Sequence, residues 1–184
     1  LEYIVDLILL NFLFIICSLP LITAYPAFVA LVGTIKDRFE DKPILAWKQF
    51  FTLFYKYIKK GMKTWIVLWV LSIVIIGDII IGLFYLPNEI KNFLLPFNLL
   101  LVVLFLGILI NIIKLFILGE DRVKRLFITS FILLIREPRN PLLIIFITML
   151  FTVLSIYLKF ILFFSFSLIA FTVYLTMFKE KEVL

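Results

Sequence analysis

The fold is decided by residues 47–63, WKQFFTLFYKYIKKGMK. Their apolar members recur at the spacing of one helix face: Trp47, Phe50, Phe51, Phe54, Tyr57 and Ile58. The opposite side is polar and mostly basic: Lys48, Thr52, Lys56, Lys59 and Lys63. A basic amphipathic helix of this kind is typical of segments that lie flat on a membrane surface. Its lysines also indicate the cytoplasmic side, where basic residues of membrane proteins accumulate.

The composition extends this interpretation to the whole chain. Its 184 residues are 65% hydrophobic with a mean hydropathy of +1.22, which leaves little material for a separate soluble domain. We therefore expect a single transmembrane domain over residues 1–184. The net charge of +6 comes from basic residues at the ends of apolar runs. This distribution favours anionic lipid headgroups as partners and argues against nucleic acid.

The residue inventory argues against an enzyme. Histidine is absent and Cys17 is the only cysteine. These absences remove the commonest general base, the commonest metal ligand and any multi-cysteine metal site. We expect a non-enzymatic protein with no catalytic residues, no cofactor and no metal. The chain begins with Leu1 rather than with methionine, so we also expect further residues upstream of it.

The apolar runs predict an all-α membrane bundle. Crossing about 30 Å of hydrocarbon takes about 20 helical residues. The run at 141–178 is long enough for two helices, and Lys159 marks a turn near its middle. We predict five full spans, at 4–23, 64–86, 93–118, 141–157 and 160–178. A short arm at 26–39, which comes after a break at prolines, makes a sixth if it is counted.

The charges orient this bundle. We predict two basic amphipathic interfacial helices, the first elbow at 44–63 and the second elbow at 120–137, both on the cytoplasmic side. Sixteen of the eighteen Lys and Arg residues then fall on that side, and only Lys91 and Lys159 lie opposite. The C-terminus is expected in the cytoplasm, whereas the N-terminus is inside or outside depending on the path of the arm. The candidate residues for docking lipid or a partner are Lys48, Lys56, Lys59, Lys63, Lys124 and Arg125.

The two elbows also resemble each other. At an offset of 76 residues, Lys48 aligns with Lys124 and Phe51 with Phe127. This match favours a weak parallel repeat of helix, elbow and helix. The alternative is that any two basic interfacial helices would align this well.

Asp78 is the only acidic residue deep in an apolar run, about 21 Å from the start of its span. An ionised carboxylate exposed to lipid costs about 2.5–3.5 kcal/mol, so Asp78 should face the bundle interior, bind a partner or be protonated. Ser155 and Ser165 are expected at a similar depth and complete a candidate polar layer. The alternative is a structural role for Asp78. We expect Asn11, Asn98 and Asn111 to join helices rather than to bind a ligand.

The break between the first span and the arm carries a family resemblance. It reads Ser18-Leu19-Pro20, then Thr23, then Pro26-Ala27, and the first elbow and Asp78 come after it. This order resembles the YesL-like family of bacterial membrane proteins, and Arg136, Asn140 and Pro141 are similar to that family's entry to its penultimate span. Pro20, Thr23 and Pro26 form the structural break in this pattern. Tyr25 departs from it, because a glycine is frequent there.

The resemblance implies a place in the bacterial cytoplasmic membrane and an association with carbohydrate uptake, and it supplies no catalytic residue. We therefore expect an accessory or regulatory component that binds subunits of a sugar importer. The alternative is a small-solute transporter or substrate-capture subunit with its site around Asp78. An enclosed polar cavity would distinguish the two, because a transporter needs one and an accessory protein can be packed solid.

Overall fold

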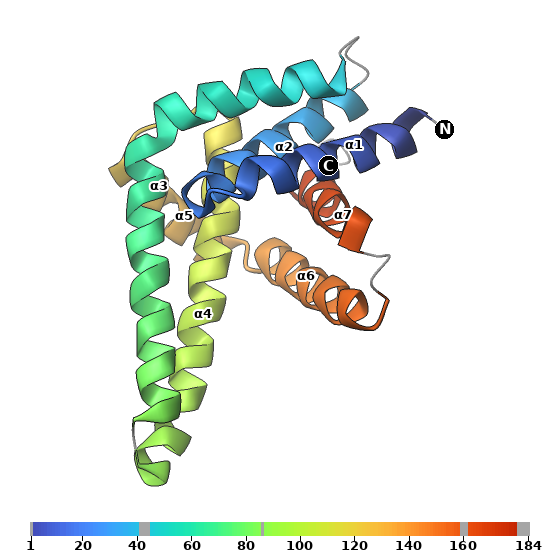
Figure 1. The fold of residues 1–184 in the computed structure, drawn as a ribbon. Helices are drawn as coiled ribbons and strands as arrows, with labels where there is room; N and C mark the ends of the chain where they lie inside the picture. Colours follow the sequence, from blue (N-terminus) through green and yellow to red (C-terminus); the bar gives the residue numbers. More distant parts are fainter. Residues whose placement is uncertain (1, 41–44, 86, 159–161, 180–184) are drawn as a thin grey trace.

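The computed structural model describes residues 2–40, 45–85, 87–158 and 162–179, and this part of the chain is helical without a strand (Figure 1). The expected all-α class is therefore confirmed. The elements in chain order are α1 (Glu2–Ser18), η1 (Leu21–Thr23), α2 (Ala24–Phe39), α3 (Ala46–Phe84), α4 (Asn88–Ile117), α5 (Val123–Arg136), α6 (Arg139–Tyr157), α7 (Leu162–Tyr174) and η3 (Leu175–Lys179). The predicted turn at Lys159 lies outside the described residues.

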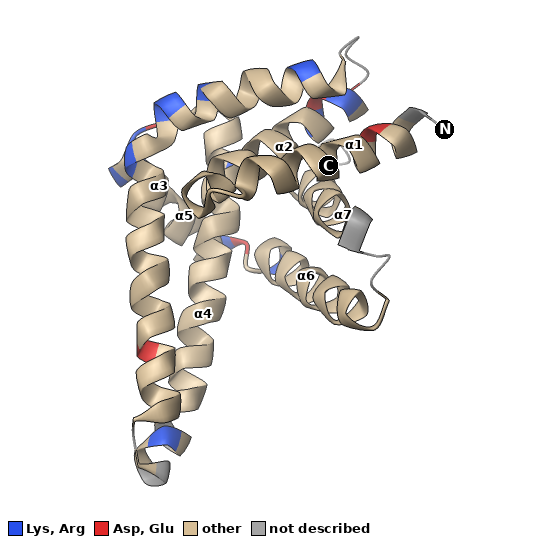
Figure 2. Cartoon of the chain, in the orientation of Figure 1, with Lys and Arg blue, Asp and Glu red and all other residues tan. Residues whose placement is uncertain are grey.

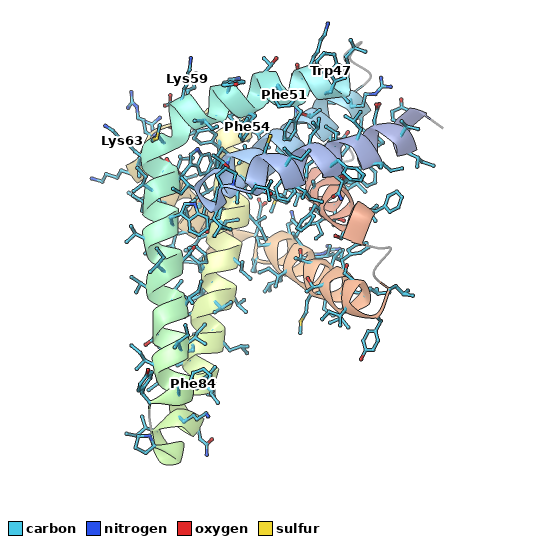
Figure 3. All side chains as sticks on the ribbon, in the orientation of Figure 1. Trp47, Phe51, Phe54, Lys59, Lys63 and Phe84 are labelled. Atoms are coloured by element: carbon cyan, nitrogen blue, oxygen red, sulfur yellow. The ribbon has the colours of Figure 1, made fainter. Side chains whose placement is uncertain are left out.

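The longest element, α3, joins the first elbow and the second predicted span in one helix of 39 residues. The elbow at 44–63 and the span at 64–86 thus form one continuous helix, because no proline interrupts the backbone hydrogen bonds between them. The helix changes direction near Lys59 and Lys63, and its second half forms a long hairpin with α4 (Figure 3). The helix α4 ends at Ile117, and Gly119, two residues later, has a φ of 100° in the left-handed region that favours glycine.

The bend of α3 is built around Gly61. The Trp65 indole N–H donates to the Tyr57 carbonyl oxygen at 2.9 Å, so the ring lies along the helix across Gly61. Phe116 at the end of α4 packs on the Trp65 ring at 4.9 Å between centroids. A side chain at residue 61 would occupy the space of both rings, so the bend requires a residue without a Cβ.

The predicted arm, α2, lies at the centre of the core. Nine of its sixteen residues are buried, because α1, α3 and α7 all pack against it. Along α3 the two helices run antiparallel: Gln49 donates to Asp37 at 2.7 Å, and Leu53 lies against Gly33. Small and β-branched residues on α2 permit this close approach.

The two ends of the described chain meet through α1 and α7. Asn11 is fully buried, and its side-chain oxygen accepts the backbone N–H of Ser167 at 3.2 Å. The Ser167 hydroxyl donates to the Leu7 carbonyl oxygen at 2.7 Å. Asn111 similarly joins α4 to α5 by donating to the Ser130 carbonyl oxygen at 3.2 Å. The expectation that Asn11 and Asn111 join helices is confirmed.

The second elbow forms α5, which runs back along α4. Ser130 lies opposite Asn111, and Leu134 lies opposite Gly107, one helical turn further along both helices. The buried stripe of Leu126, Ser130 and Leu134 therefore covers α4. Pro138 separates α5 from α6, so this elbow is not continuous with the helix after it.

Three described helices are long and apolar enough to cross a membrane: Ala46–Phe84, Ile90–Ile117 and Arg139–Tyr157. They correspond to the spans predicted at 64–86, 93–118 and 141–157. The spans predicted at 4–23 and 160–178 contain the shorter apolar helices Tyr3–Ser18 and Phe164–Phe178. Much of the surface of α3, α4 and α6 consists of exposed Leu, Ile, Val and Phe, which is unfavourable in water and indicates a membrane location.

Candidate functional site

The first half of α3 presents three faces in contiguous sectors, since successive residues turn by about 100°. The buried face, against α2 and the end of α4, comprises Phe50, Leu53, Tyr57 and Gly61. The exposed apolar stripe comprises Trp47, Phe51, Tyr55 and Met62. The lysine row comprises Lys48, Lys56, Lys59, Lys60 and Lys63, all exposed. Figure 3 shows this half of α3 from Trp47 to the bend at Lys63.

This arrangement corrects the single apolar face that the spacing predicts. Phe50 and Tyr57 are buried in the protein, whereas Trp47 and Phe51 from the same predicted face are exposed. The exposed apolar stripe borders the lysine row directly, and the Lys48 ammonium lies 5.4 Å from the centroid of the Trp47 ring. Apolar rings beside lysines are the combination that the interface of an anionic membrane, or an acidic amphipathic partner, accommodates.

The break packs against the bend of α3. The Thr23 hydroxyl lies 2.5 Å from the Cys17 carbonyl oxygen and 2.7 Å from that of Pro20, so it ties together the chain on both sides of the break. The Trp69 indole donates to the Ile22 carbonyl oxygen at 3.3 Å. With Pro26, Thr23 lines a shallow hollow of about 40 Å³ against α3. Pro20, Thr23 and Pro26 therefore have a positioning role for this part of the fold.

Tyr25, which departs from the family pattern, contributes to the same contact. Its hydroxyl lies 2.6 Å from the Ser72 hydroxyl. Its ring packs on Trp65 and Trp69, at 6.5 Å and 5.2 Å between centroids. An aromatic residue at this position thus holds α2 to the second half of α3.

The start of α5 adds a second basic surface. Arg122, Lys124, Arg125 and Ile128 line a surface hollow of about 320 Å³. Glu120 accepts the backbone N–H of Arg122 and pairs with the Arg125 guanidinium, both at 3.1 Å. The Arg122 hydrogen bond, with Arg125 beside it, lowers the pKa of the Glu120 carboxyl below its ordinary value. Of the predicted docking residues, Lys124 and Arg125 line this hollow, and sequence reasoning missed Arg122.

Both basic surfaces lie at the same end of the α3–α4 hairpin. Phe116, six residues before Arg122, packs on Tyr57 and Trp65 at the bend, so the start of α5 lies within about 20 Å of the bend. Figure 2 shows the basic residues along the first half of α3 and around its bend. Lys91 lies at the opposite end, where it donates to the Leu83 carbonyl oxygen at 3.1 Å.

The three residues of the candidate polar layer lie on different helices. Asp78 is exposed on the second half of α3, and no hydrogen bond or ion pair engages it within the described residues. Ser155 on α6 donates to the Phe151 carbonyl oxygen of its own helix at 2.7 Å. Ser165 is buried on α7. None of the three lines either of the two surface hollows, and they lie on three different helices, so the geometry does not assemble a common site from them.

The fold and these surfaces define an all-helical protein with apolar helices long enough to span a membrane and basic residues gathered at one end of them. Residues 7–79 match the model of DUF624, a protein family of unknown function. The match runs from Leu7 in α1 through the break and α2 to Ile79 in α3, and is consistent with the YesL-like resemblance. No curated protein and no solved structure matches the chain.

Proposed function

We propose that this chain is a non-enzymatic integral protein of the bacterial cytoplasmic membrane that acts as an accessory or regulatory component of carbohydrate uptake. The lysine row and the exposed apolar stripe of α3 form its docking surface. The observation that carries this proposal is the three-faced first half of α3, because a helix already packed on α2 still presents apolar and basic side chains outward. The link to carbohydrate uptake rests on the family resemblance.

The alternative, a small-solute transporter, is less well supported. Such a site needs polar groups that converge on an enclosed space. Asp78, the residue around which it would be built, is exposed and lines neither of the two surface hollows. An accessory protein needs only an available surface, which the first half of α3 supplies.

The test is purification of the tagged chain from native membranes, with identification of the proteins that come with it. We expect importer subunits with the wild-type chain, and clearly fewer with the triple variant Lys56→Glu, Lys59→Glu, Lys63→Glu. Lys91→Glu is the matched control, because it reverses one charge at the opposite end of the hairpin. An importer that is not enriched, and that takes up its sugar equally well in cells without this chain, would reject the proposal.

A further inference from the structure

We propose that the outward face of α5 binds an anionic phospholipid, with the phosphate in the basic hollow and the acyl chains along the helix. Three basic side chains line the hollow, and Glu120 is paired with one of them, Arg125. Within the described residues, no hydrogen bond or ion pair engages the side chains of Arg122 and Lys124, and Asp121 does not line the hollow. Two cationic groups therefore remain available to an anion.

Beyond the hollow, the same face of α5 continues as a row of exposed apolar side chains. Ile128 belongs to the hollow, and Phe131, Ile132 and Ile135 lie one and two helical turns beyond it. All four are about half exposed or more, because the opposite side of α5 packs on α4. A free phosphate ion would use only the basic end of this surface. A phospholipid has the charge and the apolar chains to use both ends, so the surface favours lipid.

The inference rests on the proposed membrane location and is independent of the importer partnership. The test uses the full chain, purified in detergent and stripped of lipid, with native mass spectrometry to measure retained phosphatidylglycerol or phosphatidylcholine of identical acyl chains. We expect phosphatidylglycerol to bind about tenfold more tightly, as two available basic side chains beside an anionic headgroup predict. Equal binding of the two lipids by the wild-type chain would overturn the proposal.

Variants separate the two halves of the surface. Arg122→Gln with Lys124→Gln should abolish the preference for phosphatidylglycerol, whereas the control Lys91→Gln should retain it. Phe131→Ser should weaken the binding of both lipids, because it removes part of the apolar row on α5. A double variant with an unchanged preference would overturn the site. Displacement of the lipid by an equal concentration of inorganic phosphate would assign the hollow to free phosphate instead. Because no importer is present, failure here leaves the pull-down result intact.

Discussion

A methyl group added at Gly61 would lie 2.7 Å from the ring of Phe116 and closer still to the Trp65 indole. These two rings fix the direction in which the second half of α3 leaves the bend, and Trp65 is held there by its bond to Tyr57. Gly77, in the same helix, has no neighbouring atom within 4 Å of such a methyl group. An alanine at each position should therefore raise helix propensity equally, and only the alanine at residue 61 should also disturb the packing.

Gly61→Ala should destabilise the chain by about 1–2 kcal/mol, because overpacking a close contact outweighs the gain in helix propensity. Gly77→Ala should leave stability unchanged or raise it slightly. Thermal unfolding of both variants in the same detergent gives the comparison. Equal melting temperatures for the two variants would contradict the account of the bend.

Asp78→Asn tests whether the exposed carboxylate of Asp78 contacts a partner. Since the described chain gives Asp78 no ion pair, removing its charge should not lower the melting temperature of the purified protein. It should lower the amount of partner recovered from native membranes, because an unpaired carboxylate facing lipid costs about 2.5–3.5 kcal/mol unless a partner covers it. Asp121→Asn, outside the apolar runs, is the control. Full recovery with Asp78→Asn would leave this carboxylate without a role in assembly.

Among the elements, those that end at local signals could be predicted from sequence. Prolines place the breaks around Pro20 and before α6, and the ends of the second elbow fall within three residues of α5. The continuity of α3 was not predictable from a change of composition, because a helix continues through such a change when its backbone is not interrupted. Helical spacing also groups Phe50 with Trp47, and only the position of α2 decides which of them is buried.

The same limit applies to the candidate site. Sequence identifies the lysines of both elbows, because charge at the end of an apolar run is a local property. It does not identify Arg122 as part of a hollow, nor the exposure of Asp78, because both depend on how α3, α4 and α5 pack. The contact between α1 and α7 joins residues 156 positions apart, and only the buried Asn11 gave a signal for it.

Asn11→Ala tests that contact. The change removes the fully buried Asn11 oxygen that accepts the Ser167 N–H. It should lower the free energy of unfolding by about 1–3 kcal/mol. Amide hydrogen exchange should increase most in α7, which contains Ser167. The control is Thr152→Ala, whose exposed hydroxyl donates to the Thr148 carbonyl oxygen of its own helix, so its effect on the free energy of unfolding should stay below about 0.5 kcal/mol. Unchanged exchange in α7 would contradict a joining role for Asn11.

Across the whole molecule, the two elbows have one feature in common that bears on the predicted repeat. Each packs antiparallel on the helix before it, with Leu53 against Gly33 in one case and Leu134 against Gly107 in the other. These contacts do not follow the 76-residue offset, at which Leu53 aligns with Thr129 and Gly33 with Leu109. They differ at their C-terminal ends, since α3 continues without interruption and Pro138 separates α5 from α6. The repeat therefore remains a prediction, and these two contacts do not support its register.

The distribution of charge over the molecule predicts its topology. From Lys63 to Phe84, α3 extends about 32 Å, which matches a hydrocarbon core of about 30 Å. With Cys17→Ser as background, single cysteines at Lys56 and Arg125 should react with an impermeant maleimide only from the cytoplasmic side, and one at Lys91 only from outside. Labelling after the membrane has been permeabilised with detergent is the control, because it shows that each cysteine can react with the maleimide. If Lys56 and Arg125 react from opposite sides, the two basic surfaces do not share a membrane face, and α5 cannot bind the lipid leaflet on which the lysine row lies.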